Sequence, residues 1–253
     1  MIIAANWKMN LSREQALHHL TRSSQLDAHH APSHQSVFFV PACYFGMAEE
    51  ILSSAGAIGW GGQDCHQDEA GAFTGDISAD MMLGFGCGWA LIGHSERRQY
   101  HFETDRQIAH KTAHALKKGL RVVLCVGESL ADRQAGNNDA VISGQLDTVL
   151  VYLAEQSVST ANLVIAYEPV WAIGTGNVAS LAQIDDMHGH IRDVLDSAAQ
   201  AGTDNPILYG GSVKGSNAKE IFSISNVNGA LVGGASLKSD DFIEIITAAS
   251  NLM

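Results

Sequence analysis

The most regular feature of the sequence is the recurrence of short apolar runs that end in polar or glycine-rich residues. Such runs are mostly aliphatic and do not alternate with polar residues, which is typical of strands buried on both faces. Eight of them occur, at residues 1–6, 37–40, 57–60, 90–92, 122–126, 163–166, 207–209 and 230–232.

Stretches that can form helices follow these runs, most clearly at 103–118, 139–156, 180–200 and 239–249. After the first run, Ser12 and Gln15 have the spacing of a capping box, which predicts a helix start. Strands that alternate with helices require a parallel sheet, and eight strands are the number that closes into a barrel.

The rival architecture is an open, doubly wound sheet, which would carry a G-x-G-x-x-G motif after an early strand. The nearest candidate, residues 84–88, has the wrong spacing and precedes a strand. No proline- or serine-rich linker interrupts the series. We therefore predict an α/β fold, a closed eight-stranded parallel β/α barrel that spans residues 1–253 as a single domain.

Composition narrows the possible partners. The chain is 46% apolar and 17% charged, as expected of a globular protein, and its formal charge is −12. No cluster of Lys and Arg is longer than two residues, which argues against nucleic acid and anionic membranes as partners. The four cysteines form no C-x-x-C pair and the N-terminus shows no targeting or transmembrane segment, so we predict a cytoplasmic location.

Polar residues stand where several predicted strands end. Asn6 and Lys8 follow the first strand, His94 follows the fourth, and Glu168 follows the sixth, directly before a proline. A barrel brings these tips to one rim. Glu168 is suited to act as a general base, and Lys8 supplies a positive charge that can bind an anionic substrate. Because His94 precedes a predicted helix start at Ser95, we expect a neutral imidazole that donates a hydrogen bond.

Glycines follow the last two strands, at 210–211 and 233–234. Backbone N–H groups that no Cβ shields, near helix starts, are suited to binding a phosphate. The segment after Glu168 combines the bulky Trp171 with Gly174 and Gly176, which is the composition of a lid. Each feature alone is more often ordinary structure, so their convergence carries the inference.

These residues occur in longer motifs, at 6–10, 92–98, 167–176, 209–213 and 231–237, through which the chain resembles the triosephosphate isomerase family. The motifs span nearly the whole chain in the family's order. A glutamate base beside a neutral histidine is an established pairing in that family. The resemblance implies interconversion of dihydroxyacetone phosphate and D-glyceraldehyde 3-phosphate, in glycolysis and gluconeogenesis, without cofactor or metal.

The resemblance also implies roles for individual residues. Glu168 would transfer a proton, with His94, Lys8 and Asn6 stabilising an enediolate. The implied substrate and phosphate ligands are Asn6, Lys8, Gly174, Ser212, Gly233 and Gly234, and the implied supporting residues are Glu96, Ser95, Cys125 and Tyr209. The implied lid, 169–179, contains Pro169, Val170, Trp171, Ala172, Ile173, Gly174, Thr175 and Gly176.

A long loop from Gln63 to Asp76 resembles the family's interdigitating loop, and its tip near Thr74 implies a two-fold homodimer. Two other functions stay open on sequence grounds. One is a different sugar-phosphate barrel isomerase or lyase, which would share the glycine tips but not the whole set of Lys8, His94 and Glu168. The other is a catalytically silent barrel that only binds a ligand or partner.

Overall fold

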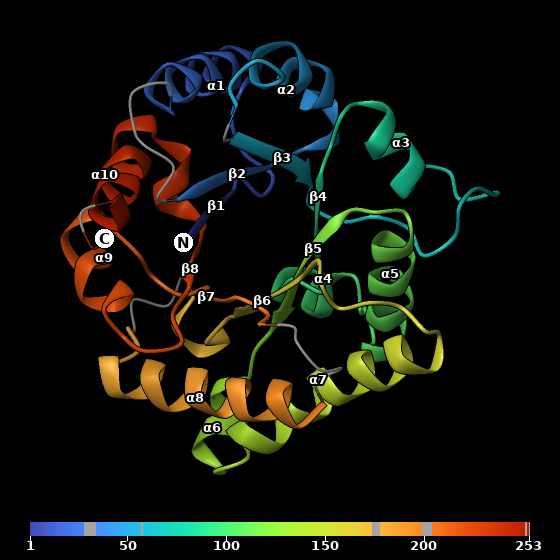
Figure 1. Cartoon of the computed structure of the whole chain (residues 1–253), viewed down its shortest axis with the longest axis vertical. Coiled ribbons are helices and arrows are strands. Elements are labelled where there is room, and N and C mark those ends of the chain that lie inside the picture. The colour runs from blue at the N-terminus through green and yellow to red at the C-terminus, as the bar shows by residue number, and fades with distance from the viewer. Residues whose placement is uncertain (28–33, 57, 174–177, 199–203, 251, 253) are drawn as a thin grey trace.

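The computed structural model describes residues 1–27, 34–56, 58–173, 178–198, 204–250 and 252. Eight parallel strands close into a barrel in chain order, and the last strand pairs with the first (Figure 1). The strands are β1 (Ile2–Asn6), β2 (Gln35–Val40), β3 (Ile58–Gly62), β4 (Trp89–Ile92), β5 (Arg121–Val126), β6 (Leu163–Tyr167), β7 (Ile207–Tyr209) and β8 (Gly229–Val232). The predicted barrel is confirmed, and the open sheet is excluded.

Helices surround the barrel and run back between successive strands (Figure 1). The α-helices are α1 (Arg13–Asp27), α2 (Phe45–Leu52), α3 (Ala79–Gly84), α4 (Ser95–Tyr100), α5 (Asp105–Lys117), α6 (Leu130–Gln134), α7 (Asn138–Glu155), α8 (Leu181–Ala198), α9 (Gly215–Phe222) and α10 (Ser239–Ser250). Short 3₁₀ turns are η1 (Ala42–Tyr44), η2 (Val170–Ala172) and η3 (Gly234–Leu237).

Helix starts follow the local sequence signals. The Ser12 hydroxyl accepts from the Gln15 N–H at 3.3 Å, while the Gln15 side chain accepts from the Ser12 N–H at 2.8 Å, so the predicted capping box forms. A second capping box, between Thr104 and Gln107, starts α5. These caps satisfy N–H groups that the first helical turn leaves without an intrahelical acceptor.

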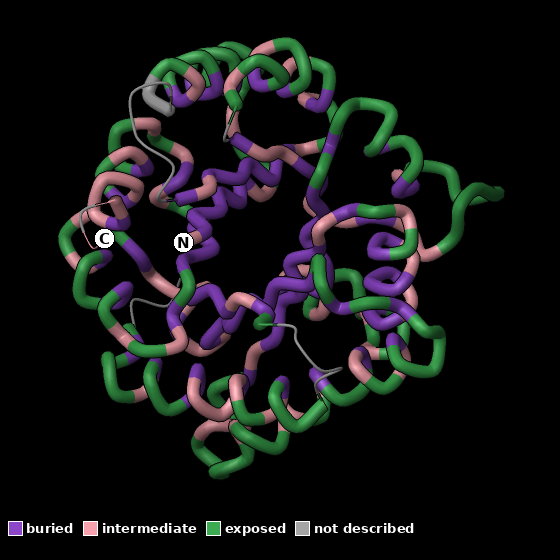
Figure 2. Tube along the Cα trace, viewed as in Figure 1, coloured by how far each residue is buried: buried purple, intermediate pink, exposed green. Residues whose placement is uncertain are grey.

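Most strand residues are buried on both faces of the barrel sheet, as Figure 2 shows for the inner ring, and the half-buried Gly59 and Trp60 of β3 are the clearest exception. One face fills the barrel interior, with side chains such as Ala4, Phe39, Leu91 and Ala166. The other packs under the helices, with side chains such as Ile3, Phe38 and Ile165. Double burial explains why the strand sequences are continuously apolar.

Parallel strands place all of their carboxyl ends at the same end of the barrel. Asn6, Tyr167, Tyr209 and Val232 each end a strand there, and the loops that follow carry the predicted functional residues. Within the described ranges, none of the helices is long and apolar enough to cross a membrane.

Candidate active site

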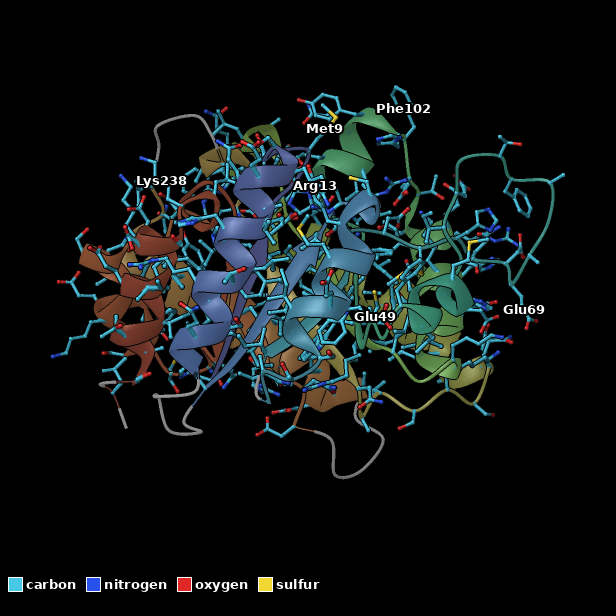
Figure 3. The ribbon with its side chains drawn as sticks, turned by 90° about the horizontal axis from the view of Figure 1, so that it is seen from above. Met9, Arg13, Glu49, Glu69, Phe102 and Lys238 are labelled. Carbon is cyan, nitrogen blue, oxygen red and sulfur yellow. The ribbon has the colours of Figure 1, made fainter. Side chains whose placement is uncertain are left out.

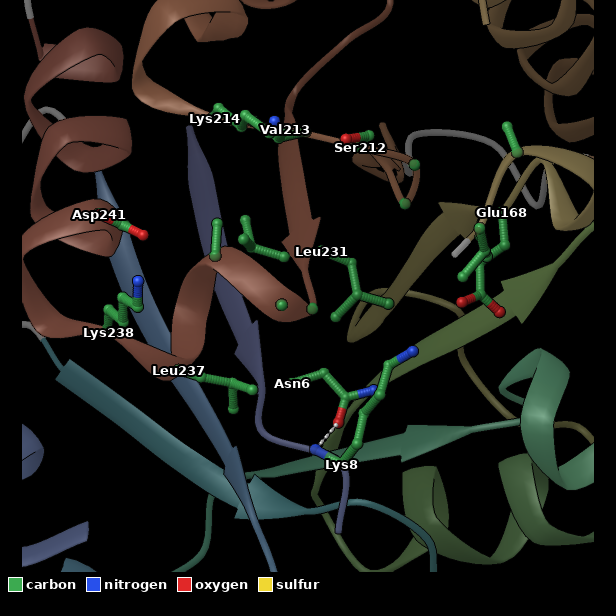
Figure 4. Close-up of a pocket in the computed structure, with 18 of the residues that line it drawn as sticks. Asn6, Lys8, Glu168, Ser212, Val213, Lys214, Leu231, Leu237, Lys238 and Asp241 are labelled. Carbon is green, nitrogen blue, oxygen red and sulfur yellow. Dashed lines mark hydrogen bonds between the residues drawn. The ribbon is translucent and has the colours of Figure 1, made fainter. Parts of the chain in front are cut away.

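A cavity of about 770 Å³ opens among the carboxyl ends of the strands (Figure 4). Groups from the first, fourth, sixth, seventh and eighth strand tips share it, so residues far apart in the sequence meet in one place. Its lining includes Asn6, Lys8, His94, Glu168, Gly210, Gly211, Ser212, Leu231, Gly233 and Gly234.

Glu168 is held at the tip of β6. Its N–H donates to the Val126 carbonyl oxygen at 2.8 Å, which extends the pairing with β5 by one residue before Pro169. The residue is 2% exposed. Gly210 makes room for it, since a Cβ there would lie 2.9 Å from Glu168 Cγ and 2.9 Å from the Tyr167 carbonyl oxygen.

Two groups bind the Glu168 carboxylate. Oε1 lies 2.9 Å from His94 Nε2, and Oε2 accepts from the Ser95 N–H at 2.9 Å, at the start of α4. Burial alone would raise the pKa of Glu168, but the interactions with His94, the Ser95 N–H and the Lys8 charge outweigh it and hold the pKa below its ordinary value. The carboxylate is therefore ionised at neutral pH.

His94 is the N-cap residue of α4, as the sequence predicted. Its Nδ1 accepts from the Glu96 N–H at 3.3 Å, so the ring proton is on Nε2 and points into the cavity toward Glu168. The helix start was expected to favour the neutral ring. Burial does lower the pKa of His94, but the adjacent Glu168 carboxylate outweighs burial and raises the pKa above its ordinary value. The expectation left out this carboxylate.

Lys8 reaches the cavity from a strained backbone, because its φ of 51° lies in the left-handed region that non-glycine residues seldom adopt. Its N–H donates to Asn6 Oδ1 at 2.9 Å, and its carbonyl oxygen accepts from Gln63 Nε2 at 2.9 Å. The Nζ atom lies 2.7 Å from Glu96 Oε1. These contacts hold the strained turn and fix the ammonium on the same side of the cavity as the Glu168 carboxylate (Figure 4).

The glycine-rich tips of β7 and β8 continue the cavity wall beyond Glu168. Within the described ranges, the N–H groups of Gly211 and Ser212 donate to no other protein group. A Cβ at Gly233 would lie 3.3 Å from Lys8 Cε, so the backbone approaches the ammonium closely. Unused N–H groups near a positive charge are suited to binding an anion.

The first part of the implied lid is anchored outside the cavity. The side chain of Glu128 is fully buried and accepts from Trp171 Nε1 at 2.7 Å, from the Tyr167 hydroxyl at 3.0 Å and from Arg133 Nη1 at 2.8 Å. The guanidinium of Arg133 also lies 5.0 Å from the centre of the Trp171 ring. Residues 174–177, which include Gly174, Thr175 and Gly176, lie outside the described residues.

Comparison with known proteins identifies the family. A family model described as triosephosphate isomerase matches residues 1–249. Triosephosphate isomerases from Ruegeria sp. (strain TM1040) and Herminiimonas arsenicoxydans are 46% and 43% identical to this chain, covering 98% of it and 97% and 98% of their own lengths. A third, from Ralstonia nicotianae, is 45% identical over 81% of this chain and 82% of its own length.

The chain belongs to the triosephosphate isomerase family. By that membership it is an isomerase, as the motifs indicated. Membership also agrees with the closed barrel, a fold to which this family gives its name.

The structure brings most of the predicted triosephosphate isomerase site together. Seven predicted residues line the one cavity: Asn6, Lys8, His94, Glu168, Ser212, Gly233 and Gly234. Glu96 contacts Lys8, and the N–H of Ser95 contacts Glu168. Cys125 is fully buried in the barrel interior, where burial raises the pKa of its thiol well above the ordinary value. The Tyr209 hydroxyl is buried beside Gly211 without a hydrogen-bond partner among the described residues.

Three residues that shape the site were not predicted from the sequence. Glu128 anchors Trp171, and Gln63 bonds to the Lys8 carbonyl oxygen. Both follow strand tips, so the rule that found Glu168 could have found them too. Gly210 was noted only as part of a glycine pair, although its missing Cβ makes room for Glu168. Across the described ranges, no group of three or more His, Cys, Asp or Glu side chains could hold a metal ion.

Proposed function

We propose that residues 1–253 act as one β/α-barrel domain that interconverts dihydroxyacetone phosphate and D-glyceraldehyde 3-phosphate. The observation that carries the proposal is the convergence of Glu168, His94 and Lys8 in one cavity, opposite backbone N–H groups that donate to no described residue. This reaction belongs to glycolysis and gluconeogenesis, and we place it in the cytoplasm on the sequence features given above.

The substrate is oriented by its phosphate. The dianion binds the N–H groups of Ser212, Gly233 and Gly234, and Gly174 of the lid completes this set. The carbonyl and hydroxyl oxygens then face His94 and Lys8, with Asn6 beside them. A phosphate held at one end fixes the distance from the reacting carbons to Glu168, which lowers the entropic part of the barrier.

Proton transfer follows in two steps. Glu168 removes a proton from the carbon next to the carbonyl, and the electron pair forms the enediolate. The Nε2–H of His94 donates to the developing oxyanion, and the Lys8 ammonium stabilises it by charge. The proton of the remaining hydroxyl group then moves to the enediolate oxygen, with Nε2 of His94 as the relay, and protonated Glu168 returns its proton to the neighbouring carbon, which yields the other triose phosphate. The contacts that now occupy Glu168, from Ser95 and His94, must give way to substrate for this to occur.

Closure of the lid, residues 169–179, excludes water from the enediolate, which would otherwise lose its phosphate. The buried Tyr209 hydroxyl supports this part of the proposal, because it has no hydrogen-bond partner among the described residues and can therefore accept from a lid N–H on closure. The Ser212 hydroxyl supplies a second such bond.

A coupled assay with D-glyceraldehyde 3-phosphate tests the proposal. Glu168→Gln removes the base but keeps the shape, so turnover should fall by at least about 100-fold, with the circular dichroism spectrum unchanged. Glu220→Gln, a matched change at an exposed position on α9, should leave turnover unaltered. Near-normal turnover in folded Glu168→Gln, or an inactive wild type, would contradict the proposal.

A two-fold homodimer is the second part of the proposal. Met9, beside Lys8, is 96% exposed, and Phe102 is 81% exposed at the same end of the barrel (Figure 3). The loop from Gln63 to Asp76, whose tip is expected near Thr74, is exposed from 68 to 76, and the segment between β3 and α3 projects from the body (Figure 1). We propose that this tip covers Met9 of a second copy and thereby steadies Lys8. Sedimentation that finds a fully active monomer at micromolar concentration rules this out.

A further inference from the structure

The cavity extends well beyond Glu168 and Lys8. At its far end the lining consists of the residues that begin α9 and α10, among them Lys214, Lys238, Asp241 and Glu244. Figure 4 places Lys214, Lys238 and Asp241 on the side of the cavity away from Glu168. None of these four residues has a role in the proton transfer proposed above.

Lys214 and Lys238 differ from most other lysines of the molecule. Lys8, Lys111 and Lys118 each lie within 2.7 Å of a carboxylate oxygen. Lys214 and Lys238 are exposed and, among the described residues, form no ion pair. Their charges are therefore not cancelled by a neighbour in contact, and they remain available to an anion that enters the cavity.

The charge of the whole molecule makes these two lysines important. A chain with a formal charge of −12 repels a phosphate dianion. Around the cavity the positive charges are Lys8, Lys214 and Lys238, while the negative charges are Glu168, Asp241 and Glu244, with Glu96 paired to Lys8. Lys214 and Lys238 therefore offset part of the negative charge around the cavity, and the loss of either would make the cavity more negative.

Both opposing carboxylates lie near a helix start. A Cβ at Gly215 would lie 2.6 Å from Glu244 Oε2, so the Glu244 carboxylate rests against the first residue of α9. Asp241 is exposed in the first turn of α10 and, among the described residues, forms no ion pair. The positive ends of the two helices offset part of both negative charges.

From this arrangement we propose that Lys214 and Lys238 attract the phosphate dianion of the substrate to the mouth of the cavity and so raise kcat/KM. The inference rests on the proposed function, which supplies the dianion. Both lysines act on the approach and binding of the substrate and take no part in proton transfer, so kcat is unaffected.

The size of the effect follows from Coulomb's law with screening. A unit charge about 10 Å from a dianion in water changes an association constant roughly threefold at about 10 mM salt, and less than twofold near 150 mM. Two lysines acting independently therefore change kcat/KM by roughly tenfold at low salt. The dependence on salt distinguishes attraction at a distance from a direct contact.

The experiment compares Lys214→Met, Lys238→Met and the double variant with Lys219→Met. Lys219 is exposed on α9, forms no ion pair with a described residue and does not line the cavity, so its loss changes the net charge equally. In the double variant kcat/KM for D-glyceraldehyde 3-phosphate should fall roughly tenfold at low salt, with kcat unchanged and most of the defect gone near 150 mM. Lys219→Met should match the wild type, and Asp241→Asn should raise kcat/KM.

Two results overturn the inference. The first is a double variant whose kcat/KM at low salt equals that of the wild type. The second is a fall in kcat/KM in Lys219→Met as large as that in the cavity variants, which would assign the effect to net charge alone. Calorimetric titration with inorganic phosphate separates this inference from the proposed function. An inactive wild type refutes the function, while weaker phosphate binding in the double variant, against unchanged binding in Lys219→Met, still supports the role of the two lysines.

Discussion

His188 on α8 should make the stability of the fold depend on pH. Its side chain is fully buried, and its Nδ1 lies 3.0 Å from the Asn226 carbonyl oxygen, so Nδ1 carries the proton and donates it. Nε2 is then an acceptor, and it has no hydrogen-bond partner among the described residues. The ring packs against Tyr167 and Tyr209. Burial lowers the pKa of His188 to about 4, although the Asn226 carbonyl and Asp185 oppose the shift.

The sign follows from where the proton binds. The unfolded chain binds a proton at His188 near pH 6.5, whereas the folded state resists it down to about pH 4. Stability from this residue is therefore fully present above pH 6.5 and is lost as the pH falls from 6.5 toward 4. At about 1.4 kcal/mol per pH unit, the total loss is about 3 kcal/mol, of which about 2 kcal/mol falls between pH 7 and 5.

Urea unfolding at pH 7 and pH 5, at one protein concentration, measures this loss. In His188→Asn the side chain keeps a donor for the Asn226 carbonyl oxygen but does not titrate. The decrease in the free energy of unfolding from pH 7 to pH 5 should therefore be smaller in this variant than in the wild type, by about 2 kcal/mol. His18→Asn, at an exposed position, should behave as the wild type does. An equal loss in His188→Asn and the wild type would show that buried carboxylates or other histidines carry the pH dependence.

Two further predictions concern the cavity. Gly210→Ala places a Cβ 2.9 Å from Glu168 Cγ and 2.9 Å from the Tyr167 carbonyl oxygen. Because the backbone of β6 cannot move away, the Glu168 side chain is displaced. Turnover in the coupled assay should therefore fall at least about tenfold. Tyr209→Phe removes a hydroxyl without a partner among the described residues. The free energy of unfolding of Tyr209→Phe should therefore stay within about 1 kcal/mol of the wild-type value. Its turnover should fall more than threefold, and a colorimetric assay should find more free phosphate lost from the substrate. A large loss of stability with normal phosphate retention would instead assign this hydroxyl to the core.

The barrel and its reactive end could be predicted because both depend on local patterns. Continuous apolar runs indicate strands buried on both faces, and parallel strands place their tips together. The limits of two strands differ from the predicted runs. β2 begins at Gln35, two residues before the predicted run, because Gln35 pairs with Ile2 at the half-exposed end of the barrel. β3 runs through Gly61 and Gly62, which resemble a turn in sequence but form ladder pairs with β4.

The contacts between side chains inside the site could not be predicted from the sequence. The 2.9 Å approach of Glu168 to His94 sets the direction of both pKa shifts, and the residues are 74 positions apart. The bond between Lys8 and Glu96 likewise depends on how two strand tips meet. Composition and spacing predict which side chains reach the carboxyl end of the barrel. They do not predict which of those side chains are in contact, and these contacts determine the direction of the pKa shifts.

The left-handed backbone of Lys8 has a consequence for any attempt to improve this protein by selection. A glycine at this position would relieve the strain of its φ of 51°, but it would remove the ammonium from the cavity. A library screened only for resistance to heat would therefore tend to discard Lys8, and the surviving variants would be more stable but would lack the charge that we propose stabilises the enediolate. Screens that alternate heat challenge with growth on a carbon source that needs the enzyme would retain it.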